Sequence, residues 1–461
     1  MSSNEWMISG FGICLLGVSL LVVFFGVEDL LLDGFFYAKR MGPKFISNQT
    51  TKEMELKKEK RIAIVIPAWH ESQIIRKMLL GNLSQIKYQN FEIFVGCYPN
   101  DPETISEVNQ ANQRDSRVHL VVNSDFGPTS KGQMLNQIIE WIRVAEGKEN
   151  FDAVLLQDSE DIIDPWALKL LNSELDESDF VQIPVFSLEV KMNEWVAGTY
   201  VDEFAESHTK DLLIRGALGA AIPSAGVGTA LSLPLVSALI AKYGFVFYEK
   251  SLTEDYELGI RAHLLGFHSK FVSAYFVDPE TFRKHFIATR EYFPKKFHRS
   301  VRQKTRWMLG IAIQGWKNLG WEGSKWNRYF LYRDRRCLVS NLVSGMTYPM
   351  TLIGLMLELD PMTSLKLNEL NLDIRWLLLA NLLLMLNRLL QRMLGVVRVY
   401  GYSAVWGIPF RWPVATVINF FSSLSAIAKE VSSRWTHSQH VWSKTEHELP
   451  LNFGTELSEV A

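Results

Sequence analysis

The sequence predicts an α/β domain, built on a mostly parallel β-sheet, that is embedded between transmembrane α-helices. Three observations support this prediction. Long uncharged apolar runs gather near the two ends of the 461-residue chain. Between residues 60 and 290, short β-branched segments alternate with segments of helical periodicity, which is typical of a parallel sheet covered on both faces. Polar side chains directly follow several of these expected strands, where such sheets bind ligands.

The composition excludes several classes of protein. Apolar residues make up 48% of the chain, with 14 Trp and 27 Phe, which excludes intrinsic disorder. The 48 basic and 50 acidic residues nearly balance, so we do not expect nucleic acid as a partner. Cys14, Cys97 and Cys337 are too few and too scattered for a disulfide framework or a thiolate zinc site.

The first apolar run, Trp6 to Val27, carries no charge and is long enough to cross a bilayer. A cleaved signal peptide is the alternative, but no basic residue precedes the run and no small-residue cleavage site ends it. We therefore expect residues 1–35 to form an N-terminal transmembrane helix. Basic residues are frequent from Lys39 to Arg61, which predicts a cytoplasmic location for the domain that follows.

Two further transmembrane helices are expected over residues 337–398. The first is the uncharged run from Cys337 to Leu357, and the second ends with Arg388 and Arg392, which can reach the cytoplasmic surface. A buried soluble helix is the alternative for the second run. Residues 412–428 include Pro, Asn and Ser, and we interpret them as an interfacial or re-entrant helix within a region (399–461) that ends in a cytoplasmic tail. A full span, which would export the tail, is the alternative.

The central domain, residues 36–294, should contain the sheet. Its helices are expected over 73–86 and 131–144. No glycine-rich dinucleotide fingerprint and no P-loop follows any strand, which disfavours a dinucleotide-dependent dehydrogenase or a P-loop nucleotidase. The four expected strands are Arg61–Ile66, Phe91–Gly96, Val118–Val122 and Ala153–Gln157.

Acidic residues follow the fourth expected strand. Asp158 and Glu160 are two residues apart, so both carboxylates could reach one hard cation. Proteins hold Mg²⁺ or Mn²⁺ with such oxygen ligands and share the ion with phosphates. Helix capping is the alternative explanation, and it is strongest for Asp164, which precedes Pro165.

Two later segments have an ordinary structural explanation when each is taken alone. The acidic run Thr253–Glu257 opens another helix, Leu258 to Leu265, where acidic side chains favour the amino terminus. The segment Pro223–Thr229 is a glycine loop, and glycine pairs are common in turns. Neither segment predicts a site without its neighbours.

Residues 295–336 form a basic amphipathic region, which by itself predicts a helix at a membrane surface. Within it, Gln303, Arg306 and Trp307 fall on one helical face. The guanidinium of arginine matches phosphate geometry, and the tryptophan ring offers a flat apolar face for a sugar.

Taken in order, these motifs resemble the membrane-embedded family 2 glycosyltransferases, the superfamily of cellulose and hyaluronan synthases. The matching segments are Ile66–Glu71, the region of Asp101, Lys131–Asn136, Asp158–Glu160, Thr253–Asp255 and Gln303–Trp307. A finer resemblance, to the bacterial phage-adsorption protein B branch, involves Tyr98–Asp101, Asp158–Asp161, Ser224–Thr229 and Trp442–His447.

The resemblance implies a nucleotide-diphosphosugar transferase fold and a set of donor-binding residues. Glu71 and Asp101 would hold the nucleoside, with Lys131 nearby. Asp158 and Glu160 would bind Mg²⁺ or Mn²⁺ and the diphosphate. The family's usual Asp-x-Asp is Asp-x-Glu here, which keeps the charge and lengthens one ligand.

The resemblance also implies catalytic and acceptor-binding residues. Asp255 would be the general base, with Glu254 beside it. Gln303, Arg306 and Trp307 would bind the diphosphate and the acceptor sugar. The glycine loop, with Gly226 and Gly228, would contact the same groups.

The function implied is inverting transfer of a sugar, from a donor that is most often a UDP-sugar, to a growing cell-surface polysaccharide at the bacterial inner membrane. Expected partners are the nucleotide sugar, a glycan or lipid-linked acceptor, membrane lipid and an outer-membrane or export component. Two alternatives stay open: a transferase acting on a lipid phosphate, and a catalytically silent scaffold or phage-receptor component.

Overall fold

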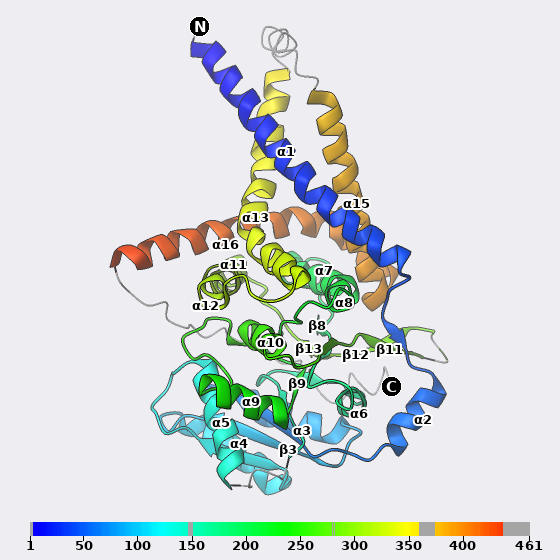
Figure 1. Ribbon diagram of the computed structural model, residues 1–461, viewed down its shortest axis with the longest axis vertical. Coiled ribbons are helices and arrows are strands. Elements are labelled where there is room, and N and C mark those ends of the chain that lie inside the picture. Colours follow the sequence, from blue (N-terminus) through cyan, green and yellow to red (C-terminus); the bar gives the residue numbers. More distant parts are fainter. Residues whose placement is uncertain (1–2, 146–150, 279, 281, 359–373, 437–461) are drawn as a thin grey trace.

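The computed structural model describes residues 3–145, 151–278, 280, 282–358 and 374–436. An α/β domain forms one end of the molecule (Figure 1). Helices α1 (Ser3–Ala38), α13 (Lys325–Glu358) and α15 (Ile374–Tyr400) extend from the other end. The predicted C-terminal motif Trp442–His447 lies outside the described residues.

A seven-stranded sheet forms the centre of the α/β domain, in the order β10-β7-β9-β5-β2-β3-β4. Strand β9 is antiparallel to both of its neighbours, and the other neighbouring pairs are parallel. The mostly parallel α/β sheet predicted from the sequence is thus confirmed. The strands are β2 (Ile62–Pro67), β3 (Phe91–Cys97), β4 (Val118–Val122), β5 (Ala153–Leu156), β7 (Phe180–Gln182), β9 (Thr229–Ser232) and β10 (Ser269–Phe271).

Helices cover both faces of the sheet, which explains why its central strands are apolar throughout. Along β2, Ile62 and Ile64 belong to one core and Ala63 and Val65 to the other. The first core is closed by α3 (Ile75–Gln85), α4 (Pro102–Arg114) and α6 (Ala167–Glu174). The second core is closed by α5 (Lys131–Ala145), α9 (Leu233–Tyr243) and α10 (Glu254–Leu264).

Two small sheets lie beside the main one and were not predicted. One joins β1 (Lys44–Phe45), β11 (Ala274–Val277) and β12 (Lys284–Ile287), and helix α2 (Asn48–Leu56) follows β1. The other has the order β6-β13-β8, with bounds Ile162–Ile163, Thr289–Glu291 and Val185–Ser187. Strand β13 brings a late segment of the chain next to the residues that follow β5.

A layer of helices connects the α/β domain to the long helices. It contains α7 (Trp195–Glu206), α8 (Leu212–Ala217), α11 (Phe297–Met308) and α12 (Gly315–Leu319), with π-helical turns at Ser207–Asp211 and Leu309–Gln314. Helix α11 corresponds to the predicted basic amphipathic segment. On its far side from the cleft described below, Lys304 pairs with Glu203 of α7 and hydrogen-bonds Asn419.

Three described helices are long and apolar enough to cross a membrane: Gly10–Ala38, Trp376–Tyr400 and Tyr402–Thr436. The first two agree with the predicted spans. The third predicted span, 337–357, is the last part of α13, a helix that packs against α1 and α16. It is not among the three, and its crossing of a membrane stays a prediction.

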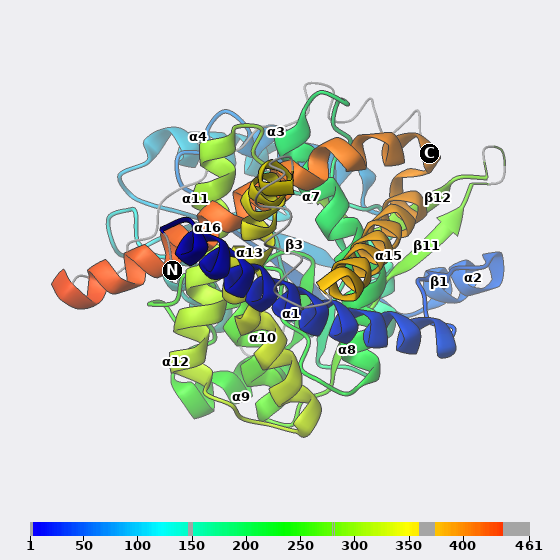
Figure 2. The same ribbon diagram turned by 90° about the horizontal axis from the view of Figure 1, so that it is seen from above.

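Helix α16 (Ile408–Thr436), which follows the 3₁₀ turn Tyr402–Gly407, contains the segment predicted to be interfacial. It runs across the molecule, whereas α13 follows the long axis (Figures 1 and 2). Its inner residues Ile418 and Ser422 are buried, while Phe421 and Leu424 are exposed. This orientation agrees with an interfacial helix, although its length and composition would also suit a span, and its place in a membrane stays a prediction.

Charged residues gather where α7 and the following π-turn meet the long helices, and we call them the base cluster. Lys210 pairs with Asp33 and Glu206, and Glu206 also pairs with Arg388 at 2.9 Å and Arg392 at 3.0 Å. Burial alone would raise the pKa of Glu206, but its three cationic partners, Arg388, Arg392 and Lys210, lower it to about 2. The other members are Glu28, Asp29, Asp202, Arg333, Arg336 and Arg411.

Candidate active site

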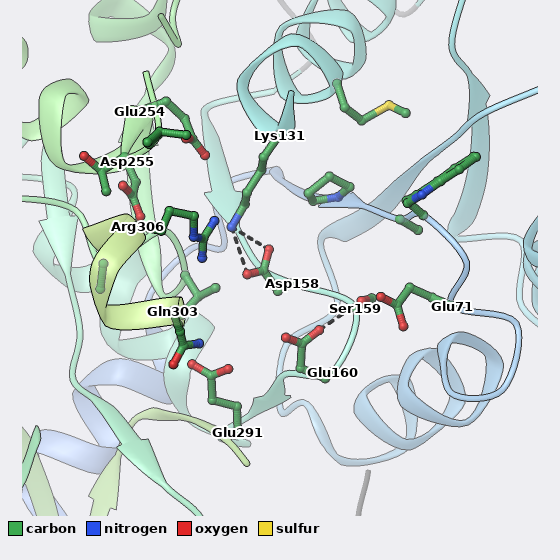
Figure 3. A pocket seen from close by; sticks show the side chains of 18 of the residues that line it. Glu71, Lys131, Asp158, Ser159, Glu160, Glu254, Asp255, Glu291, Gln303 and Arg306 are labelled. Atoms are coloured by element: carbon green, nitrogen blue, oxygen red, sulfur yellow. Dashed lines mark hydrogen bonds and ion pairs between the residues drawn. The ribbon is translucent and has the colours of Figure 1, made fainter. Parts of the chain in front are cut away.

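A cleft opens where the carboxyl ends of β2, β3 and β5 meet the start of α10 and the inner face of α11 (Figure 3). Parallel strands bring their carboxyl ends to one edge of a sheet, so polar residues that follow them converge there. Most of the predicted site residues line this cleft: Glu71, Lys131, Asp158, Glu160, Glu254, Asp255, Gln303, Arg306 and Trp307.

The loop after β5 carries the predicted metal ligands. The backbone N–H of Asp158 donates to Asp161 Oδ2 at 2.6 Å, and Ser159 Oγ donates to Glu160 Oε2 at 2.9 Å. Lys131, the first residue of α5, places its Nζ 2.6 and 2.8 Å from the two carboxylate oxygens of Asp158. These contacts hold the loop so that Asp158 and Glu160 face the cleft.

Acidic charge accumulates behind this loop. Asp161 is fully buried, and its Oδ1 has no hydrogen-bond partner among the described residues. Burial raises the pKa of Asp161 well above its usual value, and the nearby carboxylates of Glu291, Asp158 and Glu160 raise it further. This end of the cleft therefore favours a bound cation or a proton.

Glu254 and Asp255 begin α10 and line the cleft. Burial and the neighbouring Asp255 raise the pKa of Glu254 to about 7, against the opposing effects of Lys131 and Arg306. Burial also raises the pKa of Asp255, against the effect of Lys131. A carboxylate with a raised pKa accepts a proton more readily than an exposed one, which suits a general base.

The predicted glycines shape the wall next to this base. Gly226 has φ +81°, and a Cβ at this position would lie 2.5 Å from Asp255 Oδ2, so only glycine allows the approach. Gly228 has φ +62°, and a Cβ there would lie 2.9 Å from Thr289 Oγ1. The lining itself comes from the neighbouring Ala225 and Val227.

Helix α11 supplies the basic wall. The side chains of Gln303 and Arg306 point into the cleft in Figure 3. Gln303 Oε1 is buried without a hydrogen-bond partner, and no hydrogen bond or ion pair joins the Arg306 guanidinium to another side chain in the described part of the chain. Trp307 packs edge-on against Tyr200, with ring centroids 6.1 Å apart. This wall thus offers an unsatisfied acceptor and an unpaired cation to a ligand.

Asp101 does not line the cleft, in contrast to the direct nucleoside contact that we expected. It caps α4 by accepting from Thr104 N at 3.3 Å, and it accepts from His70 N at 2.6 Å. Only 2% of the residue is exposed. Its carboxylate is therefore engaged in fixing the loop that carries Glu71, whose N–H donates to Thr104 Oγ1.

Sequence reasoning missed Glu291, and it gave no role to two aromatic residues of the segments that it expected at the site. Glu291 lies on β13 of a small sheet and lines the cleft, and no local sequence pattern predicts that position. Trp69 and Tyr98 form an aromatic wall, with centroids 5.1 Å apart, and Tyr98 Oη lies 2.7 Å from Thr129 Oγ1. Their position directly after β2 and β3 was the available signal.

The donor atoms fit a divalent cation that is shared with a substrate. Asp158 and Glu160 provide hard oxygen ligands of the kind that Mg²⁺ and Mn²⁺ prefer. Among the described residues, no group of three or more His, Cys, Asp or Glu side chains is arranged to hold a metal ion. Two carboxylates would thus be completed by phosphate and water, which is the usual arrangement for a metal that accompanies a nucleotide.

Comparisons with known proteins agree with this geometry. Residues 60–310 match the model of the family described as "Glycosyltransferase like family 2". The chain is 35% identical to "Bacteriophage adsorption protein B" of Escherichia coli (strain K12), over 97% of this chain and 64% of the relative. "Bacteriophage N4 adsorption protein B" of Escherichia coli O157:H7 matches to the same extent. The chain thus spans about 64% of the length of these curated relatives.

The fold is shared with a solved structure. It is a mannosyltransferase from Pyrobaculum calidifontis in complex with GDP-Man and Mn²⁺, with a TM-score of 0.53 and 12% sequence identity. The similarity covers 92% of this chain and 99% of the other. At this identity the likeness concerns the fold alone, which is the nucleotide-sugar transferase fold expected from the sequence.

Proposed function

This chain belongs to the glycosyltransferase-like family 2, and from that premise we propose that it transfers a sugar, with inversion, from a nucleotide-diphosphosugar to a growing bacterial cell-surface polysaccharide at the inner membrane. The observation that carries the proposal is the convergence, in one cleft, of two carboxyl groups with raised pKa and a guanidinium that forms no ion pair within the described parts of the chain. Such a pairing serves a reaction in which a hydroxyl loses a proton while an anion departs.

The donor would lie along the edge of the sheet. Trp69 and Tyr98 offer aromatic faces to the base, and Glu71 lines the same end of the cleft. Lys131 and Arg306 supply positive charge for the diphosphate. A UDP-sugar is the donor that we expect, following the family resemblance, and the relative of similar fold was solved with GDP-Man.

Asp158 and Glu160 would hold the divalent cation, Mg²⁺ or Mn²⁺. When bound, the ion would supply Lewis-acid stabilisation of the negative charge on the diphosphate. The presence of Mn²⁺ in the mannosyltransferase structure supports this assignment, as does the oxygen-only donor set.

Asp255 would act as the general base, with Glu254 setting its electrostatic environment. An acceptor hydroxyl would give its proton to Asp255 while its oxygen forms the new bond to the anomeric carbon. The bond from that carbon to the diphosphate oxygen breaks, and the electron pair leaves with the diphosphate. Arg306 stabilises the charge that develops there. A single displacement of this kind inverts the anomeric configuration.

The acceptor would approach along α11. Gln303 and Trp307 suit a sugar, because the amide pairs with hydroxyl groups and the indole ring stacks on the sugar face. Helix α11 packs against α16, near the helices that are long enough to cross a membrane. This arrangement supports a glycan or lipid-linked acceptor at the membrane, with the catalytic domain (36–294) in the cytoplasm and an export partner beyond it.

Membranes containing the wild-type chain, incubated with a panel of labelled nucleotide sugars, test this proposal. We expect release of nucleoside diphosphate with one donor, dependence on Mg²⁺ or Mn²⁺, and a large water-soluble glycan as product. A chloroform-soluble product would instead identify a lipid-phosphate acceptor. No release with any donor, under conditions where the protein is folded, would contradict the transferase activity and favour the silent scaffold.

A further inference from the structure

The ion pair between Lys131 and Asp158 links the donor-binding helix to the metal-binding loop. Both carboxylate oxygens of Asp158 lie within hydrogen-bond distance of the Lys131 ammonium, at 2.6 and 2.8 Å. The pair is largely shielded, because the lysine side chain is 16% exposed and the aspartate side chain 28%. The ammonium therefore covers the oxygens that a cation bound to Asp158 would need.

A second set of anions lies close to the same ammonium. The Cβ position of Gly226 lies 3.4 Å from Lys131 Nζ and 2.5 Å from Asp255 Oδ2, so the two charged groups flank the same point. The carboxylates of Asp158, Glu254 and Asp255 raise the pKa of Lys131 above its usual value, although burial opposes this. Lys131 Nζ thus has carboxylates on two sides, Asp158 on one and Asp255 on the other.

Two cations compete for one carboxylate in this arrangement. A divalent ion that takes Asp158 as a ligand displaces the ammonium from its closest anionic partner, and the loss of this contact opposes metal binding. The diphosphate of the donor provides such a partner, since Lys131 and Asp158 line the same cleft. A metal ion that arrives alone leaves the cationic charge of Lys131 without this compensation.

We propose that Lys131 competes with the divalent cation for Asp158, so that the cation binds strongly only together with the nucleoside diphosphate group of the donor. The lysine is then a positioning residue, and its effect is that the metal ion and the donor bind to the cleft together. This inference rests on the proposed function, in particular on the assignment of Asp158 as a metal ligand.

The test is Mn²⁺ binding by the purified full-length chain without nucleotide, measured from the electron paramagnetic resonance signal of the free ion. Lys131→Gln and Lys131→Met each remove the competing charge, and the second keeps the aliphatic length of the side chain. We expect either folded variant to bind Mn²⁺ about tenfold more tightly than the wild type, as loss of a close cationic competitor implies. Melting temperature identifies which variant is folded.

Two further variants show whether the gain acts through Asp158. Lys131→Arg keeps the charge and should bind Mn²⁺ as weakly as the wild type. In the double variant Lys131→Gln with Asp158→Asn, the gain should disappear. This pattern would not arise from a lysine that merely supports the fold.

The outcomes separate this inference from the proposed function. If Asp158→Asn abolishes Mn²⁺ binding but removal of Lys131 leaves the affinity unchanged or lower, the competition is wrong and the metal site stands. If no variant binds Mn²⁺ without nucleotide, the competition is wrong, and the metal assignment is judged by the dependence of nucleoside diphosphate release on Mg²⁺ or Mn²⁺. Sugar transfer itself is judged separately, by release of nucleoside diphosphate.

Discussion

The base cluster and the cleft both concentrate acidic and basic side chains, but they pair them differently. In the base cluster, Glu206 contacts Arg388, Arg392 and Lys210. In the cleft, Arg306 has no ion pair within the described residues, and the pKa of Glu254 is raised to about 7 by burial and Asp255. Charges that are satisfied by the protein stabilise its architecture, whereas charges left incompletely paired are available to a ligand.

The comparison predicts that cleft substitutions change activity more than stability, and base-cluster substitutions the reverse. The largest effect should come from Asp255→Asn. Loss of the general base should lower the rate of sugar transfer by about 10²–10⁴-fold, while donor binding and melting temperature stay near those of the wild type. Release of nucleoside diphosphate measures the rate, and equilibrium binding of the donor provides the control. If the activity stayed within a few-fold of the wild type, Asp255 would be a helix-capping residue and not the general base.

The base cluster should respond to Arg411→Met with a large loss of stability. Arg411 holds Asp202 through two bonds of 2.8 and 2.9 Å, and both side chains are at most 4% exposed. Removing the arginine leaves a buried carboxylate unpaired, which should lower the free energy of unfolding by about 3–5 kcal/mol. Denaturant unfolding in detergent measures the change.

The matched control lies on the same helix. Arg434 pairs with Glu430, but its side chain is 68% exposed. Arg434→Met should cost about 0–1 kcal/mol, as expected for an exposed ion pair. Equal losses in the two variants would show that burial does not distinguish these pairs.

In the cleft, Arg306→Gln should lower the rate of sugar transfer and leave the stability of the fold nearly unchanged. The guanidinium has no hydrogen bond or ion pair to lose among the described residues, so the free energy of unfolding should change by no more than about 0.5 kcal/mol. Transfer should fall by about 10²–10³-fold, because a donor that stabilises the departing charge is removed. Arg302→Gln, an exposed position one turn earlier on α11, should leave both unchanged. A marked loss of stability for Arg306→Gln would contradict the view that this group is reserved for a ligand.

The smallest predicted effect is a shift in pH dependence. Transfer by the wild type should rise as the carboxylate pair ionises, through a pH near the Glu254 pKa of about 7. In Glu254→Gln the neighbouring negative charge is gone, so the pKa of Asp255 falls and the rise should move to lower pH. The pH profile of kcat/KM measures this, with exposed Glu249→Gln as the control. An unchanged pH profile would show that Glu254 does not influence the catalytic carboxylate.

The raised pKa of Glu254 also affects stability, which should fall as the pH rises, whereas the activity should increase. Because the pKa of Glu254 is higher in the folded protein than its ordinary value of 4.5, protonation favours folding. This contribution is complete below about pH 4.5 and is lost as the pH rises through about 7. Activity and this part of the stability therefore change in opposite directions over that interval.

The sequence predicted the parallel strands well, because each is a short apolar run with a polar end. The expected strand Val118–Val122 has the bounds of β4, and the expected helix at 131–144 is α5 with one more residue. Antiparallel β9 and the small sheets escaped prediction. Strand β9 pairs with β5 and β7, and such long-range pairing leaves no periodic signal in a four-residue segment.

Within the site, prediction succeeded where side chains follow strands or share a helical face, as Asp158 and Arg306 do. It did not foresee that Asp101 caps α4, because the sequence cannot show whether an aspartate before Pro102 and Glu103 binds the helix terminus or a ligand. It missed Glu291, because position on a small sheet depends on strands more than 100 residues away in the chain.

Helix α11 lines the cleft with one face and is hydrogen-bonded to α16 through the opposite face. Lys304 and Thr305 hydrogen-bond Asn419 and Ser422 of α16, on the side opposite to Gln303 and Arg306. The helix cannot roll about its axis without breaking these bonds. Its guanidinium and amide are thus aimed before any substrate arrives, and little reorganisation energy remains to be supplied when the leaving group departs.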